Sequence, residues 1–415
     1  MNKKLVLDGG FALGVVLALS ACTGSKDAAD DTGDSRTDTA DTSVDTDSGT
    51  DTADTGDTAD TGETPLGDAV LVGRVTDNTG AAIEGAEVSL DSGETTQTDA
   101  AGLFRVENLG TGDAEEIVRA VATFSKDGFM GSTRIFEDLD ATARTWQVSM
   151  IPRAAGQTFD TASTIDVRLA FGVGGSLTIR PGTLVDENGA AAIGQATAYL
   201  TMIDVDDDVS LRAAPGDFSA QMSDGSAAFL ESWGMAELLV FGADGKELQL
   251  ATGTTAEVAM PVVFPRIGRE QESGQTVPFL WFDEATGQWM QDGEAVLSTE
   301  GSAFIGEIDR FDHWNSDKPM ETTCVSANVE DATGPLENLQ VEAMGLDYTN
   351  YTDHFTDADG DAYMLVRRQS NLSFTVYDAN GTELATMNAT TPNTIGDCQS
   401  LLDAGQLQEV ASFTL

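Results

Sequence analysis

Residues 70–106 have the sequence VLVGRVTDNTGAAIEGAEVSLDSGETTQTDAAGLFRV, which carries the strongest structural signal in the chain. Polar and apolar residues alternate between turn signals over residues 68–152, for example in 83–90, which is the period-two pattern of strands; Val70, Val72 and Val75 precede the first turn. A turn-forming cluster at 77–80 separates these valines from the run at 83–90. Because no amphipathic helical run of useful length follows, the pattern predicts a small β-sandwich over residues 67–153, the N-terminal module.

Three motifs in this module carry a family resemblance: Gly73-Arg74-Val75-Thr76-Asp77, Gly85-Ala86-Glu87-Val88 and Thr98-Asp99-x-x-Gly102-x-Phe104. Together they resemble the carboxypeptidase regulatory-like domain, a transthyretin-like β-sandwich. The proline that usually follows the first turn is absent, since Ala82 precedes Ile83, whereas Gly128-Phe129 matches a motif found later in many copies. The glycines suit turns that need positive φ.

Residues 320–415, the C-terminal module, repeat this scheme and are expected to form a second regulatory-like sandwich. Residues 356–363 align with residues 98–104 and are one residue longer. Cys324 opens the module and Cys398 lies near its end. In an exported chain these two thiols are expected to form a disulfide, and two buried free thiols are the alternative.

Residues 154–319 form a β-rich middle module with three notable clusters: Pro215-Gly216-Asp217-Phe218, Leu280-Trp281-Phe282-Asp283-x-x-x-Gly287-x-Trp289 and Phe311-Asp312-His313-Trp314-Asn315-Ser316-Asp317. The set resembles the middle region of bacterial surface lipoproteins and, more distantly, that of cartilage intermediate layer protein-like proteins. In that pattern the last motif reads His-Phe-Ser-x-Trp-Asn-Cys-Asp. Here Arg310 stands at the His and Ser316 at the Cys. The resemblance implies architecture more than activity.

Residues 1–21 predict a lipoprotein signal peptide. Two lysines precede an apolar core at 11–19, which is shorter than the roughly 20 residues that span a bilayer. Small residues before Cys22 resemble the bacterial lipobox, in which this cysteine is lipidated; an ordinary signal peptide with a chance cysteine is the alternative. Thr23 then implies the outer membrane, with the chain facing the periplasm or the cell surface. The membrane is the expected partner, through the acyl chains.

Residues 22–66 predict a disordered Asp/Thr-rich linker after the lipidated cysteine. The hexamer DTADTG occurs twice in succession, and 13 acidic residues face two basic ones. Such a segment has almost no apolar surface to bury, and self-repulsion extends it. We interpret it as a tether; weak calcium binding and O-glycosylation of its threonines are the alternatives.

The whole chain of 415 residues has a formal net charge of −49, of which the linker carries −11 and residues 67–415 carry −39. This charge excludes nucleic-acid binding through a basic patch. The only histidines are His313 and His354, and HExxH, GxSxG and P-loop motifs are absent. No cofactor is expected, and the chain is predicted not to be an enzyme.

Two groups of aspartates are candidate calcium ligands: Asp204, Asp206, Asp207 and Asp208, and Asp357, Asp359 and Asp361. Calcium takes six to eight oxygen ligands, and clustered carboxylates supply several of them. The second group lacks the glycine and the twelfth-position glutamate of an EF-hand. Plain turns are the alternative in both places.

Four tryptophans of the middle module are candidate ligand-binding residues: Trp233, Trp281, Trp289 and Trp314. An exposed row of them would stack on sugar rings, whereas core packing is the alternative. The sequence as a whole predicts an all-β protein of tandem β-sandwich modules behind a lipoprotein signal and a linker. Its expected role is a non-catalytic surface scaffold or an adhesion module for a glycan or protein ligand. Carbohydrate binding through sandwich loops or the tryptophans is the alternative.

Overall fold

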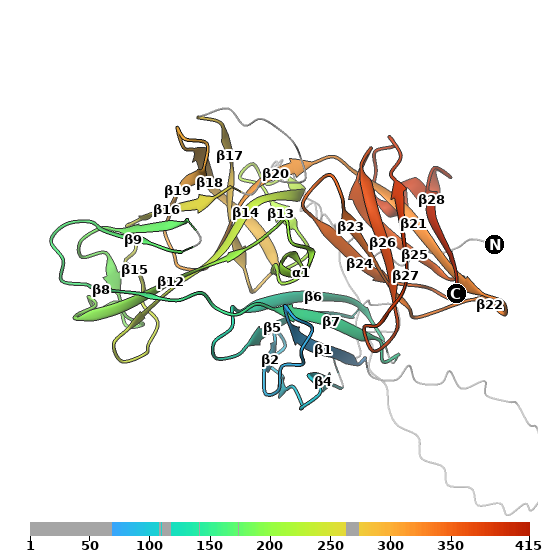
Figure 1. Ribbon diagram of the computed structural model, residues 1–415, viewed down its shortest axis with the longest axis horizontal. Helices are drawn as coiled ribbons and strands as arrows, with labels where there is room; N and C mark the ends of the chain where they lie inside the picture. Colours follow the sequence, from blue (N-terminus) through green and yellow to red (C-terminus); the bar gives the residue numbers. More distant parts are fainter. Residues whose placement is uncertain (1–68, 108, 110–117, 141, 173, 263–273) are drawn as a thin grey trace, which may run out of the picture. The chain divides into compact units, whose positions relative to one another are not determined.

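The computed structural model describes residues 69–107, 109, 118–140, 142–172, 174–262 and 274–415. The predicted signal peptide, Cys22 and the linker lie outside these residues. Strands form nearly all of the regular structure (Figure 1), and the two described helices are short, α1 (Asp208–Leu211) and α2 (Cys398–Asp403). Within the described ranges, no helix is long and apolar enough to cross a membrane. The expected all-β fold is confirmed.

The N-terminal module is a sandwich of two sheets with the orders β4-β1-β7 and β3-β2-β5-β6. Strands β1 and β7 run parallel, and the other neighbours run antiparallel. Leu71 and Val75 of β1 face the core, while Val72 between them is only half-buried. The strands are β1 (Leu71–Asp77), β2 (Glu87–Leu90), β3 (Thr95–Gln97), β4 (Leu103–Val106), β5 (Val118–Ser125), β6 (Ser132–Leu139) and β7 (Thr145–Met150).

The C-terminal module has the same topology. One sheet has the order β22-β21-β25 with β28 beside β21, and the other has the order β24-β23-β26-β27. Strand β28 runs parallel to β21, as β7 does to β1. The internal repeat is therefore present in three dimensions. The strands are β21 (Thr322–Asp331), β22 (Gly334–Pro335), β23 (Gln340–Gly345), β24 (Tyr351–Phe355), β25 (Asp361–Arg367), β26 (Asn371–Tyr377), β27 (Glu383–Thr390) and β28 (Gln408–Thr414).

One turn shows how closely the two modules correspond. Gly102 and Gly360 both have positive φ, at 76° and 78°. The amide of Val75 donates to the carbonyl of Gly102, and that of Val329 donates to the carbonyl of Gly360. A Cβ at either glycine would lie 2.4 or 2.5 Å from the carbonyl oxygen of that same valine. This correspondence pairs residue 104 with residue 362. The two turns therefore have the same length, and the prediction that the second is one residue longer is wrong.

Replacing Gly102 or Gly360 with alanine is expected to lower the free energy of unfolding by more than about 1 kcal/mol, because the new Cβ meets a backbone carbonyl in addition to the unfavourable φ. Gly80 provides the control, since it has a φ of 80° with nothing within 4 Å of its Cβ position. Urea unfolding of the three variants measures the difference. A G80A loss equal to that of G102A would contradict the close-approach explanation.

The middle module contains an eleven-stranded sheet with the order β8-β12-β14-β20-β17-β18-β19-β16-β10-β9, and β13 lies beside β14 and β18. Phe159, Leu177 and Trp314, from opposite ends and the centre of this order, share one core, so the sheet curls around it. Strands β11 and β15 pair with each other in a separate two-stranded sheet. The strands of the module are β8 (Gln157–Asp160), β9 (Val167–Ala170), β10 (Ser176–Ile179), β11 (Leu184–Val185), β12 (Gln195–Ile203), β13 (Ser219–Gln221), β14 (Ala227–Gly242), β15 (Gln249–Leu250), β16 (Ala256–Pro261), β17 (Thr276–Asp283), β18 (Gln288–Leu297), β19 (Ala303–Ile308) and β20 (His313–Met320).

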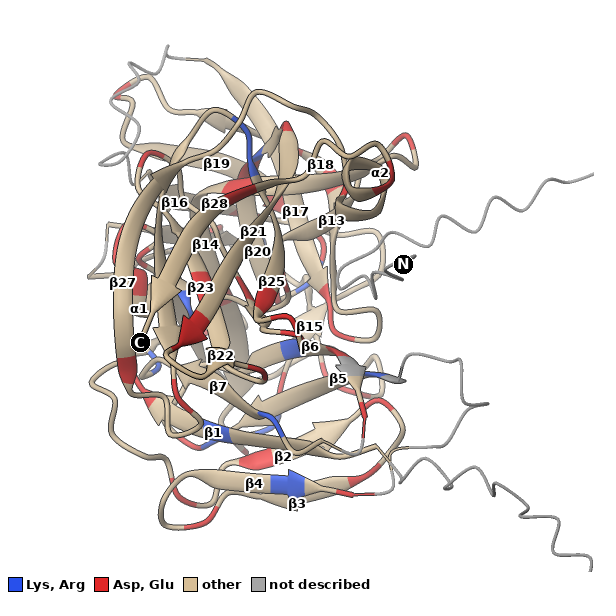
Figure 2. Cartoon of the chain, turned by 90° about the vertical axis from the view of Figure 1, so that its right-hand side faces the viewer, with Lys and Arg blue, Asp and Glu red and all other residues tan. Residues whose placement is uncertain are grey.

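The three modules share part of their hydrophobic core. One apolar cluster combines Met130 and Ile151 of the N-terminal module, Phe218 and Trp289 of the middle module, and Tyr351 of the C-terminal module. Sharing a core in this way couples the stability of each module to that of its neighbours. Acidic residues, in contrast, are spread over all three modules, with few basic residues among them (Figure 2).

Candidate functional site

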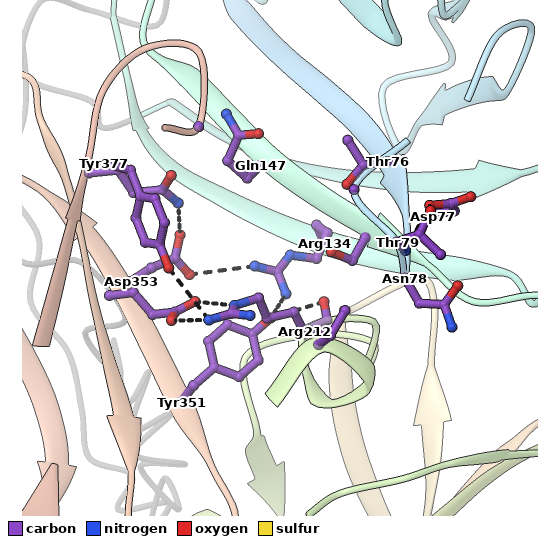
Figure 3. A pocket seen from close by; sticks show the side chains of 16 residues that line it. Thr76, Asp77, Asn78, Thr79, Arg134, Gln147, Arg212, Tyr351, Asp353 and Tyr377 are labelled. Atoms are coloured by element: carbon purple, nitrogen blue, oxygen red, sulfur yellow. Dashed lines mark hydrogen bonds and ion pairs between the residues drawn. The ribbon is translucent and has the colours of Figure 1, made fainter. Parts of the chain in front are cut away.

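A pocket of about 370 Å³ lies where the three modules meet (Figure 3). The N-terminal module contributes the turn after β1 together with side chains from β6 and β7. The middle module contributes α1 and the residue that ends it, and the C-terminal module contributes β23, β24 and the β26–β27 turn. The lining residues are Thr76, Asp77, Asn78, Thr79, Gly80, Arg134, Gln147, Ser149, Val209, Arg212, Gln340, Glu342, Tyr351, Asp353, Tyr377 and Gly381.

Local turn chemistry places the residues at two of the pocket's edges. The Asp77 carboxylate accepts from the backbone amides of Thr79 and Ala81, which fixes the turn after β1. Asp207 caps the N-terminus of α1 by accepting from the Ser210 amide, and Arg212 follows the last turn of that helix. The two edges are thus built by short polar motifs, while the pocket floor is built by strands.

Two ion pairs join the modules inside the pocket. The Arg212 Nε and Nη2 atoms both lie 2.6 Å from the Glu342 carboxylate, a bidentate pair in which the Glu342 side chain is 7% exposed. The Arg134 Nη2 atom lies 3.4 Å from Asp353, and both side chains are about nine-tenths buried. Arginine suits such sites because its planar fork matches a carboxylate. Each pair links the C-terminal module to another module.

The hydroxyls of two tyrosines extend this network. Tyr351 accepts a hydrogen bond from Arg134 and donates to the Arg212 carbonyl oxygen, 3.3 Å away. The Tyr377 hydroxyl lies 3.5 Å from Arg212 Nη2. Burial, followed by the charge of Glu342, raises the pKa of Tyr377 to about 12. Burial lowers the pKa of Arg212, but the hydrogen bonds and the charge of Glu342 outweigh it and raise that pKa overall. The arginine therefore stays charged and the tyrosine neutral.

Two amide atoms beside the pocket have no hydrogen-bond partner among the residues that the structure describes. Gln340 is 6% exposed and donates from Nε2 to Asp353 at 2.6 Å, yet its Oε1 accepts from no group in the described part of the chain. The Nε2 atom of Gln147, on β7, is also buried and donates to no described residue. Buried amide atoms are costly to leave without hydrogen bonds. Both atoms have almost no accessible surface, so they are buried behind the pocket wall and do not face its interior.

The two aspartate groups predicted as calcium ligands form turns. The Asp204 carboxylate accepts from the Asp206 amide, and Asp207 is occupied as the cap of α1. Asp357 accepts from the amides of Asp359 and Asp361, as Asp99 does in the equivalent turn of the N-terminal module. Neither group, including Asp208, brings three ligand atoms within reach of one ion in the part of the chain described. These positions therefore have the turn structure that was the alternative.

The structure brings together a different group that could hold a metal, which was not predicted from the sequence: Glu284, Asp312 and His313. Among the described residues it is the one set whose ligand atoms lie within 4.8 Å of one another. His313 is buried, with Nε2 at 3.2 Å from the Gly131 carbonyl oxygen and Nδ1 at 3.6 Å from Asp312. The β17–β18 turn brings Glu284 to a pair far along the chain, so sequence spacing could not identify it.

The four tryptophans do not form an exposed row. Trp233, Trp289 and Trp314 are at most 2% exposed. Trp281 is half-buried, with the Arg310 guanidinium 4.0 Å above its ring centroid. The expectation that this set stacks on sugar rings is therefore wrong, because the indoles fill the cores of the curled middle sheet.

The residues that follow Trp314 in the Phe311–Asp317 motif are also buried. Asn315, Ser316 and Asp317 have no exposed surface. Asn315 accepts from the Ser232 hydroxyl and donates to Asp317 at 2.6 Å. Burial raises the pKa of Asp317 well above its usual range. The motif thus holds β14 to β20 through a buried polar row.

The two cysteines behave as predicted. Cys324 on β21 and Cys398 at the start of α2 form a disulfide, with a sequence separation of 74 residues. Leu401 packs beside the bridge in a small apolar cluster. The disulfide holds α2 against the sheet that contains β21 and β28. Cys22 lies outside the described residues.

Comparison with protein-family models supports the resemblance of the N-terminal module to the carboxypeptidase regulatory-like domain. The carboxypeptidase regulatory-like domain model matches residues 70–143, so this stretch is similar to domains of that class. No curated protein matches the chain.

Matched solved structures include the Bacillus anthracis TIE protein (10% identity, 84% of this chain and 50% of that chain, TM-score 0.18). Also matched are BcpA, the major pilin subunit of Bacillus cereus (9% identity, 84% and 98%, TM-score 0.17), and the full-length major pilin SpaD from Corynebacterium diphtheriae (7% identity, 84% and 97%, TM-score 0.18). This chain spans half the length of the TIE chain. TM-scores at this level support no functional argument.

Proposed function

We propose that the protein is a non-catalytic scaffold, anchored in the outer membrane through Cys22 and carried on the acidic linker. The main support for this proposal is the junction of the three modules, where two buried ion pairs and a shared apolar cluster join them into one body. A body of this kind presents surfaces at a fixed geometry, as a scaffold or adhesion module requires. The tether would hold it away from the bilayer.

Further ion pairs across the modules support a structural role for the arginines. Arg153 lies 3.2 Å from Glu237, and Arg367 lies 3.4 Å from Glu231, with both carboxylates nearly buried. The chain has 15 arginines but only six lysines. Arginine is preferred where ion pairs are buried, whereas lysine is a more strongly hydrated point charge.

The anchoring part of the proposal is tested with Cys22→Ala in the full chain, expressed in a bacterium with an outer membrane. We expect the unchanged chain to incorporate radiolabelled palmitate and to fractionate with the outer membrane, because several acyl chains bind firmly. The C22A chain should lose the label and leave the membrane fraction. A labelled C22A chain, or an unlabelled and soluble unchanged chain, would contradict lipid anchoring.

A further inference from the structure

We propose that Glu284, Asp312 and His313 form a binding site for a divalent transition-metal ion of the Zn²⁺ type. The proposal goes beyond the scaffold function and does not depend on it. It rests on three ligand atoms that lie within 4.8 Å of one another, on the orientation of a buried imidazole and on the repulsion between two carboxylates.

The buried imidazole has one nitrogen on the side of Asp312. His313 Nε2 lies 3.2 Å from the Gly131 carbonyl oxygen, which can only accept a hydrogen bond, so we assign the ring proton to Nε2. In the neutral ring this leaves a lone pair on Nδ1, which lies 3.6 Å from Asp312. Metal-binding histidines usually donate their other nitrogen to a carbonyl or carboxylate in this way, because that bond fixes the tautomer and the ring orientation.

Two neighbouring side chains surround the ring. The Phe282 ring contacts it edge-on, with the ring centroids 6.5 Å apart. Glu237 lies opposite His313 in the β14–β20 pair, and its carboxylate accepts from the Gly131 amide and is paired with Arg153. The charge of Glu237 is thus balanced within the protein, and its contact with Gly131 steadies the residue that orients the imidazole.

The two carboxylates of the proposed site lie close together and are accessible. Negative charges within 4.8 Å repel each other, and a cation between Glu284 and Asp312 removes that cost. The turn that carries Glu284 is fixed, because the Asp283 carboxylate accepts from the Ala285 amide and the Thr286 hydroxyl. Glu284 is exposed and Asp312 is partly exposed, so an ion can enter from solvent and water can supply a further ligand.

The mixture of ligands selects the kind of ion. One imidazole nitrogen and two carboxylate oxygens suit Zn²⁺ and related ions, whereas Ca²⁺ takes six to eight oxygens. Ligands of a tetrahedral zinc ion lie about 3.3 Å apart, close to the 3.6 Å between His313 Nδ1 and Asp312. The exposed Glu284 side chain can change rotamer to complete the set. A proton on Nδ1 competes with the metal and would leave only a His313–Asp312 ion pair.

The test is calorimetric titration of the full chain, kept in detergent and freed of metal by dialysis against EDTA and then against buffer. The titrants are ZnCl₂ and, as comparators, MgCl₂ and CaCl₂. We expect the tightest-bound Zn²⁺ to have a Kd below about 10 µM, tighter than either comparator. Because the ion binds the folded state, it should also raise the unfolding temperature.

Glu284→Gln and His313→Asn each remove one ligand and should weaken that binding by at least about tenfold. Glu294→Gln, the same change at an exposed position of β18, and His354→Asn, at the other histidine of the chain, should leave it unchanged. Because His313 is buried, thermal unfolding of each metal-free variant is compared, and E284Q decides if H313N unfolds. The proposal is overturned if Zn²⁺ does not bind at this affinity, if Mg²⁺ or Ca²⁺ binds more tightly, or if E284Q binds Zn²⁺ like the unchanged chain, which would indicate scattered surface carboxylates.

Discussion

Replacing Arg212 with methionine is expected to lower the free energy of unfolding by about 3 kcal/mol. The substitution leaves Glu342 with a side chain that is 7% exposed and without the bidentate partner that compensates its charge. An unpaired buried carboxylate costs far more than the pair contributes, which is why the effect is large. Urea denaturation followed by tryptophan fluorescence and by far-ultraviolet circular dichroism measures it.

Two further variants separate this explanation from general damage. Arg180 forms a similar bidentate pair with Glu307 in the middle module, but both side chains are about half exposed. Arg180→Met should therefore change stability by less than about 1 kcal/mol. The double variant Arg212→Met/Glu342→Met removes both buried charges and should regain most of the loss. If R180M and R212M cost the same, burial of the pair is not the cause.

Removing the disulfide is expected to lower the free energy of unfolding by about 4 kcal/mol. The bridge closes a sequence separation of 74 residues, so it strongly restricts the unfolded chain. It also holds α2 beside β21, the strand that pairs with the last strand of the chain. The Cys324→Ala/Cys398→Ala variant, unfolded in urea, gives the loss directly.

Reduction of the unchanged chain provides an independent measurement of the same quantity. Reduction and the double alanine variant should shift the urea midpoint to lower concentration by similar amounts, because each removes the cross-link from the unfolded chain without adding a charge. Cys22→Ala in the same assay should have no effect on the midpoint, which controls for the loss of a thiol elsewhere. A midpoint that stays unchanged on reduction would show that the bridge contributes nothing to stability.

Much of the fold was predictable because its signals are local. The period-two runs and the glycine turns at 98–104 and 356–363 lie within a few residues, and each has its own physical cause. The Cys324–Cys398 pair followed from composition and export. The burial of the tryptophans could not be predicted in the same way, since a sequence does not show whether an indole faces solvent or the core of a curled sheet.

The pocket could not be predicted, because its parts come from three modules. Arg134 and Asp353 are more than 200 residues apart, as are Asp77 and Tyr377 at opposite walls. No spacing rule joins such residues. One signal was present in the composition: a chain with many more arginines than lysines has the residue type that buried ion pairs use. That signal indicates buried pairs without saying where they lie.

We expect the three modules to unfold as one cooperative body, because they share a core and buried ion pairs. Differential scanning calorimetry of the full chain measures this cooperativity, since independent cooperative units appear as separate heat-absorption peaks. We predict a single transition whose calorimetric and van't Hoff enthalpies agree, and a split or broadened transition in R212M. Two or three resolved transitions in the unchanged chain would contradict the claim and would show modules that unfold independently.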